Sequence, residues 1–227
     1  TVNSADSEIT VTTPLAVSAG VNNNALHVIK STLTGGSAGG MMNADDLTDL
    51  SGNTVVSVND NSITLSDGST ASSYLYGGYL TTDSIADISE TSGISVNGNH
   101  VSVQDSTIKS AVISNRIYVN GGYLYAGDIT GLSSENVTVS DNSVTAVNST
   151  LGATVYGGYF ETTEHEKGAD DTASADAISV SGNKVTLLDT YVDGDNVYGG
   201  YGVIDNNSKA DSVVLSPVNV NNNTVDI

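Results

Sequence analysis

Near-copies of Leu75-Tyr76-Gly77-Gly78-Tyr79 recur along this chain, and their recurrence is the strongest indication of its fold. Three copies are Val119-Asn120-Gly121-Gly122-Tyr123, Val155-Tyr156-Gly157-Gly158-Tyr159 and Val197-Tyr198-Gly199-Gly200-Tyr201. A degenerate first copy, Ala38-Gly39-Gly40-Met41, precedes them. Repetition of one unit at a nearly constant interval is the sequence signature of a solenoid or a similar repeat fold.

A second recurring phrase consists of two short apolar–polar alternations joined by a turn that contains asparagine. One example is Ile94-Ser95-Val96-Asn97-Gly98-Asn99-His100-Val101-Ser102-Val103. Alternation with period two predicts half-buried strands on both sides of the turn. The turn asparagines lie 37 to 43 residues apart and define five repeats and the start of a sixth: Asn24, Asn61, Asn99, Asn142, Asn183 and Asn223.

Strand-forming Val and Thr and turn-forming Asn, Gly, Asp and Ser dominate the composition. We therefore predict an all-β fold, a right-handed parallel β-helix (β-solenoid), as a single domain over residues 1–227, with residues 1–20 leading into it. A repeat of about 40 residues is long for one coil, so we expect two coils of roughly 20 residues in each repeat. About ten rungs at ~4.8 Å would then make a rod ~50 Å long.

Equivalent residues of successive coils stack in such a fold, which predicts structural ladders. A turn asparagine tolerates the left-handed backbone conformation and can bond to the next copy. The Gly-Gly pair between the tyrosines suits a sharp bend or close backbone packing. The predicted asparagine ladder consists of Asn61, Asn99, Asn142 and Asn183.

The second predicted ladder is aromatic and consists of Tyr79, Tyr123, Tyr159 and Tyr201, beside a shorter file of Tyr76, Tyr156 and Tyr198. Stacked rings stabilise a wall, so one interpretation of these tyrosines is structural. If the first file faces outward, it forms an aromatic strip that could hold sugar rings or a partner surface.

The segments that follow each Gly-Gly-Tyr are variable and acidic, and we expect them to be exposed loops. Solenoids place such insertions on one face, often the binding face. The predicted loops run from Met41 to Gly52, Thr81 to Gly93, Glu161 to Ala177 and Gly202 to Ser212.

The charge of the chain excludes some partners. Lys and Arg total 6, Asp and Glu total 26, and the formal net charge is −20. Nucleic acids and anionic membrane surfaces attract basic proteins, so neither is an expected partner. The sequence contains no run of about 18 apolar residues, and we do not expect insertion into a membrane. The absence of cysteine agrees with an exported bacterial protein and equally with a cytosolic one.

Catalytic chemistry finds little support in the residues. Arg116 is the single arginine, whereas polysaccharide-cleaving sites combine clustered carboxylates with a cation. No Gly-x-Ser-x-Gly nucleophile motif is present. We expect no cofactor; the weak candidates for Ca²⁺ are carboxylates in the acidic segments, namely Asp45, Asp46, Asp49, Glu164, Asp170 and Asp171.

The tandem units of strand, asparagine turn, strand and Val-Tyr-Gly-Gly-Tyr resemble the passenger regions of bacterial autotransporters and related adhesin-like surface proteins. The resemblance covers about residues 21–227 and implies a right-handed parallel β-helix exported to the bacterial cell surface. The chain is then expected to be an extracellular, non-catalytic structural or adhesin-like solenoid. Its partner would be a host or bacterial surface protein or glycan. The alternatives are a surface filament or layer subunit, in which copies stack end to end, and, third, a glycan-active β-helix enzyme.

Overall fold

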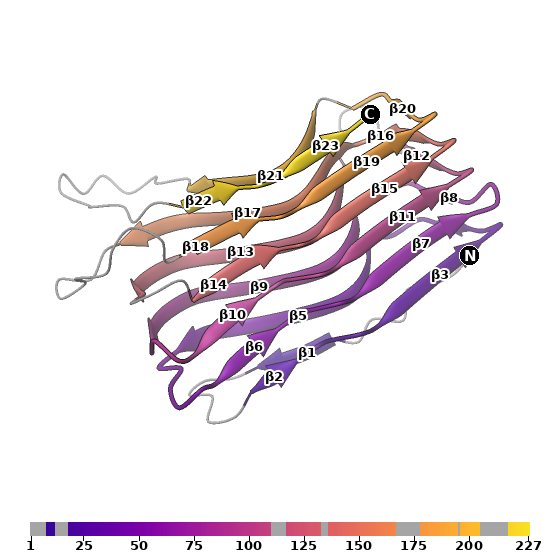
Figure 1. Ribbon diagram of the computed structural model, residues 1–227. Helices are drawn as coiled ribbons and strands as arrows, with labels where there is room; N and C mark the ends of the chain where they lie inside the picture. The colour runs from indigo at the N-terminus through magenta and orange to yellow at the C-terminus, as the bar shows by residue number, and fades with distance from the viewer. Residues whose placement is uncertain are drawn as a thin grey trace.

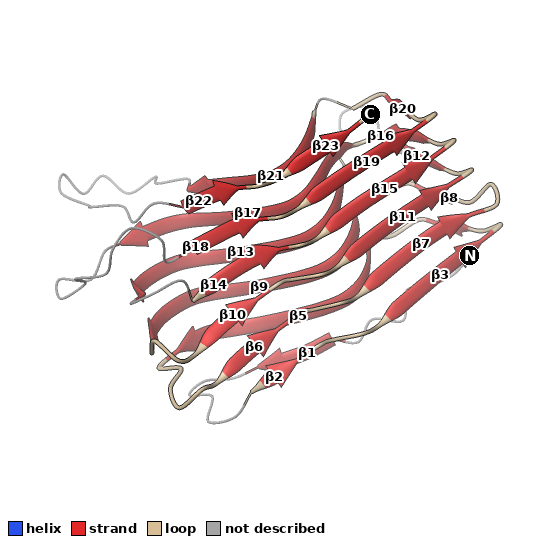
Figure 2. Ribbon diagram, viewed as in Figure 1, coloured by secondary structure: helices blue, strands red, loops and turns tan. Residues whose placement is uncertain are grey.

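The computed structural model describes residues 8–11, 18–109, 117–132, 136–166, 178–194, 196–204 and 218–227. Within these ranges the regular secondary structure is entirely β-strand (Figure 2). All the strand pairs are parallel, and the strands stack into four sheets. The predicted parallel β-solenoid is therefore confirmed. No helix long and apolar enough to span a membrane occurs in this part of the chain.

The first sheet, here called the long sheet, forms one whole side of the solenoid (Figure 1). Its central strands are 12 to 15 residues long. In order across the sheet, its strands are β1 (Glu8–Val11), β5 (Ser37–Thr48), β9 (Leu75–Ile88), β13 (Tyr118–Leu132), β17 (Thr154–Glu166) and β21 (Val197–Ile204).

Three sheets of short strands complete each coil. The second sheet contains β2 (Ala19–Gly20), β6 (Val55–Ser57), β10 (Gly93–Ser95), β14 (Val137–Ser140), β18 (Ile178–Ser181) and β22 (Val218–Asn221). The third contains β3 (Ala25–Ile29), β7 (Ser62–Ser66), β11 (His100–Gln104), β15 (Ser143–Val147), β19 (Lys184–Leu188) and β23 (Thr224–Asp226). The fourth contains β4 (Thr32–Leu33), β8 (Thr70–Ala71), β12 (Thr107–Lys109), β16 (Thr150–Gly152) and β20 (Tyr191–Val192).

Each repeat makes one coil, so the prediction of two coils per repeat is wrong. Leu75 of β9 pairs with Val119 of β13, and Val101 of β11 pairs with Val144 of β15. A repeat thus contributes a single strand to every sheet. The residues that we had assigned to a second coil belong to the long strand. A stack of six strands at ~4.8 Å extends roughly 25 Å, about half of the expected length.

The predicted acidic loops are largely strand. The segment from Met41 continues in β5 to Thr48, and the segment from Thr81 continues in β9 to Ile88. The register of these two strands is the same on both sides of Asp45, but the alternation of buried and exposed side chains changes phase at Asp45 and Asp46. Because strict period two is lost at that point, the sequence there resembles a loop. The last two predicted loops begin as strand, in β17 to Glu166 and in β21 to Ile204. Their remaining residues, 167–177 and 205–212, lie outside the described residues.

Within the N-terminal segment that we expected to lead into the solenoid, two short strands already belong to its sheets. Strand β1 pairs with β5, and β2 pairs with β6. The short strands lie where the asparagine phrase predicts them, as in β10 and β11 around the turn at Asn99. Their inward residues, such as Ile94, Val101 and Val103, are almost completely buried.

Candidate functional site

Asparagine side chains form a continuous hydrogen-bonded ladder inside the solenoid. The backbone nitrogen and the Nδ2 of Asn61 each donate to Oδ1 of Asn99 at 3.0 Å, and the same Nδ2 donates to the Val21 carbonyl oxygen at 2.8 Å. The pattern repeats from Asn99 to Asn142, from Asn142 to Asn183 and from Asn183 to Asn223. Each of Asn61, Asn99, Asn142 and Asn183 is 0 % exposed.

The left-handed residue of each turn is the one before the ladder asparagine, so our assignment of that conformation to the asparagine itself is wrong. Asp60 has φ 57°, Gly98 has φ 65° and Asp141 has φ 55°. The ladder asparagines are absent from the positive-φ residues of the described chain. Asp and Gly are the residue types that adopt this conformation readily, and their turn directs the following asparagine inward.

The Gly-Gly pair brings the long sheet against these turns. A Cβ on Gly77 would lie 2.6 Å from the backbone nitrogen of His100, and a Cβ on Gly78 would lie 2.4 Å from Cγ of Asn99. The contact divides the core into two apolar clusters. Leu75 lies in one cluster and Leu80 in the other, on either side of the glycines. Because the ladder amides are bonded within this contact, their role is structural.

The predicted tyrosine file projects from the outer surface of the long sheet. Ring centroids are 5.2 Å apart for Tyr79 and Tyr123, 5.2 Å for Tyr123 and Tyr159, and 5.5 Å for Tyr159 and Tyr201. All four rings are partly exposed. Residues that follow them in the chain, such as Leu80 and Phe160, are buried in the core instead.

The shorter file lies beside the first and completes a continuous aromatic surface. Tyr76 contacts Tyr79 with centroids 4.7 Å apart, and Tyr156 stacks on Tyr198 at 5.1 Å. We call the nine connected rings the tyrosine face: Tyr74, Tyr76, Tyr79, Tyr118, Tyr123, Tyr156, Tyr159, Tyr198 and Tyr201.

Two members of the tyrosine face were not among the residues that we singled out. Tyr74 and Tyr118 stack at 5.7 Å, just before the recurring pentads. Each lies two residues before a pentad position, Tyr76 or Asn120, and therefore on the same face of its strand. The strand alternation could therefore have identified both of them.

Asn120 interrupts the shorter file. It occupies the position paired with Tyr76 in β9 and Tyr156 in β17. Its side chain is 1 % exposed, and among the described residues its Oδ1 has no hydrogen-bond partner. The smaller side chain leaves a hollow of about 330 Å³. The residues that line this hollow, which we call the Asn120 hollow, are Tyr74, Tyr76, Tyr118, Asn120, Tyr123, Tyr159 and Glu161.

Glu161 places a carboxylate in the wall of this hollow. Its Oε2 accepts hydrogen bonds from the hydroxyl groups of Tyr159 at 2.9 Å and Tyr123 at 3.2 Å. Burial, and second the adjacent carboxylate of Glu161, raise the pKa of Tyr123 and of Tyr159. Both phenols therefore remain protonated at neutral pH and donate to the carboxylate.

A second hollow opens in the tyrosine face where β5 carries Ala38 and Met41 in place of tyrosine. These residues pair with Tyr76 and Tyr79 of β9. The hollow measures about 390 Å³ and also touches Asn43 and Tyr74, and its lining contains no Asp, Glu, Lys, Arg or His. The two hollows thus share aromatic walls and differ in the carboxylate of Glu161.

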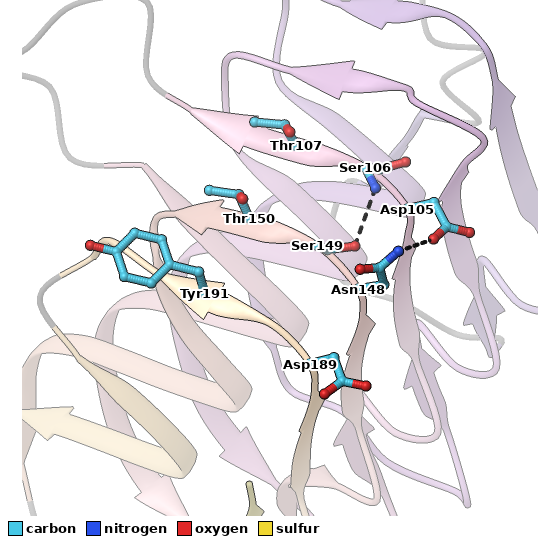
Figure 3. Close-up of a pocket in the computed structure, with 8 residues that line it drawn as sticks. All are labelled: Asp105, Ser106, Thr107, Asn148, Ser149, Thr150, Asp189 and Tyr191. Atoms are coloured by element: carbon cyan, nitrogen blue, oxygen red, sulfur yellow. Dashed lines mark hydrogen bonds between the residues drawn. The ribbon is translucent and has the colours of Figure 1, made fainter.

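A third hollow, of about 400 Å³, lies along the corner between the third and fourth sheets (Figure 3). Asp105, Asn148 and Asp189 line it in successive coils, with φ of 49°, 48° and 49°. Nδ2 of Asn148 donates to Oδ1 of Asp105 at 2.6 Å. The lining is polar except for the ring of Tyr191, and its hydroxyl groups and carboxylates belong to the turn ladder of this corner.

The weak candidates for calcium binding do not form a cluster where the structure describes them. Asp45, Asp46 and Asp49 are exposed, and Oδ1 of Asp46 accepts from Oγ of Ser84 at 2.6 Å. Among the described side chains, no group of three or more histidines, aspartates or glutamates could hold a metal ion. The side chain of Glu164 and all of Asp170 and Asp171 lie outside the described residues.

Comparisons of the chain with protein-family models, with curated proteins and with solved structures found no match.

Proposed function

We propose that this chain is a non-catalytic, adhesin-like β-solenoid of the bacterial cell surface, which binds its partner through the tyrosine face. The observation that carries the proposal is that aromatic rings are gathered on the outer surface of the long sheet. Nine of the eleven tyrosines belong to the tyrosine face, in a chain with one Phe and no Trp.

The tyrosine face is larger than the fold requires. The two core clusters consist of aliphatic residues, Met42 and Phe160, and the ladder of buried asparagines joins the coils without any tyrosine. Outward positions of the third sheet carry small polar residues, such as Thr64, Ser102 and Thr145, and exposed apolar residues elsewhere, such as Ile29 and Leu188, do not join into a comparable aromatic surface. Tyrosine offers a large contact area with little loss of side-chain entropy, which is why it is enriched in binding surfaces.

The location at the bacterial surface is supported by the sequence. The repeats resemble autotransporter passenger regions, and the net charge of the chain is −20. Such acidity keeps an exposed protein soluble and discourages contact with anionic surfaces. The partner on this view is a host or bacterial surface protein or glycan.

An adhesion assay with two matched fourfold variants tests the proposal. The first variant changes Tyr79, Tyr123, Tyr159 and Tyr201 to Thr, which retains strand propensity. The control changes Thr64, Ser102, Thr145 and Thr186 to Ala on the third sheet, where these residues are paired across the coils. Circular dichroism establishes that both variants are folded.

The expected result is that wild-type chain and control variant attach to mucin-coated or gelatin-coated surfaces and that the tyrosine variant attaches at least about tenfold less. Equal attachment of both variants would exclude the tyrosine face as the binding surface. Sedimentation that shows ordered end-to-end assembly of the wild-type chain would favour the filament subunit. Release of sugars from mucin would favour the glycan-active enzyme.

A further inference from the structure

We propose that the Asn120 hollow binds a protonated primary amine. This inference rests on the proposed binding role of the tyrosine face and adds the chemistry of the ligand. The site consists of five tyrosine rings, the Glu161 carboxylate and the amide of Asn120.

The shape of the hollow follows from one departure from the repeat. Tyr76 and Tyr156 occupy the equivalent positions of the neighbouring coils, where Asn120 stands in β13. A tyrosine at this position would fill the space between them. The hollow of about 330 Å³ is large enough for an alkylammonium group together with several carbon atoms.

The electrostatics of the hollow favour a cation. The faces of aromatic rings are electron-rich, and tyrosine rings attract ammonium groups within about 6 Å of their centroids. Glu161 adds an acidic side chain, while no Lys, Arg or His lines the hollow. The ion pair found among the described residues, Lys184 with Asp226, lies on the third sheet. The net charge of −20 further attracts cations and repels anionic ligands.

The hydrogen-bonding groups of the hollow require a donor. The two tyrosine hydroxyls that approach Glu161 already donate to its Oε2. Oδ1 of Asn120 is buried and lacks a donor among the described residues, which is an unfavourable state for a polar atom. A primary ammonium group carries three N–H donors and can serve both Asn120 and Glu161. A quaternary ammonium group has no N–H, so the primary amine is the better match.

The hollow beside Ala38 and Met41 is an internal comparison. It shares Tyr74 and Tyr76 with the Asn120 hollow, adds Tyr79 and has a volume of about 390 Å³, but it lacks a carboxylate. Amine binding should therefore depend on Glu161, and the second hollow should not bind the amine in place of the Asn120 hollow.

The test is a titration of the whole chain with n-butylammonium chloride at neutral pH, where the amine is protonated. The probe has the length of a lysine side chain, and 1-butanol is its neutral counterpart. Tyrosine fluorescence reports binding, because the chain has no Trp and most of its tyrosines lie in the tyrosine face. The variants are Glu161→Gln, Asn120→Tyr and, as a control that removes one charge elsewhere, Asp189→Asn.

We expect saturable binding of n-butylammonium to the wild-type chain and to Asp189→Asn, and no binding of 1-butanol. Binding to Glu161→Gln should weaken about tenfold or more, since the charge is lost at constant shape. The Asn120→Tyr variant should remain folded, because it restores the repeat, and should lose binding. Amine affinity that is unchanged in Glu161→Gln, or equal binding of 1-butanol, would overturn the proposal.

A second pair of probes separates the two sources of a primary amine and excludes neutral sugars. Stronger binding of glucosamine than of n-butylammonium supports an amino-sugar ligand, and the reverse order supports a lysine side chain of a protein. Equal binding of glucosamine and N-acetylglucosamine would refute the requirement for a cation. Because amine binding is measured without any surface, it can fail while adhesion through the tyrosine face persists, and it can persist if adhesion fails.

Discussion

The side chain of Asn99 lies directly against Gly78, so closely that a Cβ on Gly78 would be 2.4 Å from the Asn99 Cγ. The same relation joins Gly40 to Asn61, Gly122 to Asn142, Gly158 to Asn183 and Gly200 to Asn223. Each glycine therefore meets the asparagine that follows it in the chain, across the variable segment. The two recurring phrases of the sequence are one structural unit in space.

Substitution of Gly78 by Ala should destabilise the solenoid. The added methyl group has no room beside Asn99, and overpacking of this kind lowers the free energy of unfolding by about 1–3 kcal/mol. Urea denaturation measures the loss. Gly35→Ala is the control, because a Cβ at Gly35 has no heavy atom within 4 Å. In an Asn99→Ala background the cost of Gly78→Ala should shrink; a cost that stays the same would contradict the contact.

Replacement of Asn99 by Asp should lower the free energy of unfolding more than Gly78→Ala does. The size of this loss should depend on pH. Nδ2 of Asn99 donates to the Val58 carbonyl oxygen at 2.7 Å and to Oδ1 of Asn142 at 3.0 Å, and Asp cannot supply these bonds. An uncompensated buried carboxylate costs about 3–5 kcal/mol at neutral pH. Burial raises the pKa of that carboxyl above its ordinary ~3.9, so the penalty shrinks as the pH falls and grows as it rises through this range.

Urea denaturation of Asn99→Asp between acidic and neutral pH, relative to the wild-type chain, measures this dependence. The exposed substitution Asn53→Asp adds the same charge and should show little change in stability. If the two variants lost equal stability at neutral pH, the net charge rather than the buried ladder would be responsible.

The tyrosines of the tyrosine face should ionise at higher pH in the folded protein than in the unfolded chain. Burial is the main cause that raises the pKa of Tyr76 and of Tyr123 above the ordinary value of 10.0. Above about pH 10 the unfolded chain therefore loses phenol protons that the folded chain retains, and the free energy of unfolding decreases as the pH rises. Ultraviolet absorbance of phenolate, with and without urea, measures the difference. Superimposable titration curves would show that these rings are not buried in solution.

The acid dependence of stability should contain a contribution from His100. Burial is the main cause that lowers the pKa of His100 below 6.5, and a hydrogen bond to the backbone of Ser143 opposes this effect. The unfolded chain then binds the proton more tightly, so stability is present above the unfolded pKa of about 6.5 and decreases as the pH falls below it. The proton NMR signal of the ring gives the pKa directly. The His100→Gln variant should lose this part of the pH dependence of unfolding; a variant with the full dependence would argue against His100 as its source.

The repeated phrases determine the all-β class, the parallel solenoid and the stacking of equivalent residues, because period-two alternation and residue identity at equivalent positions are local properties. The buried strands around Asn99 and the contacts among Tyr79, Tyr123 and Tyr159 follow from them. Tertiary pairing decided how many coils a repeat makes, since this depends on which distant strand, such as β13 for β9, accepts the hydrogen bonds.

Tertiary structure also decided the features that matter most for binding. The segment around Asp45 is strand although its buried and exposed residues change phase there, because it pairs with β9 of the next coil. The hollow at Asn120 exists because two neighbouring coils carry tyrosine at the paired position and because Glu161 of the next coil reaches the same place. Cavities and close contacts depend on the register of separate coils, which a single stretch of sequence does not contain.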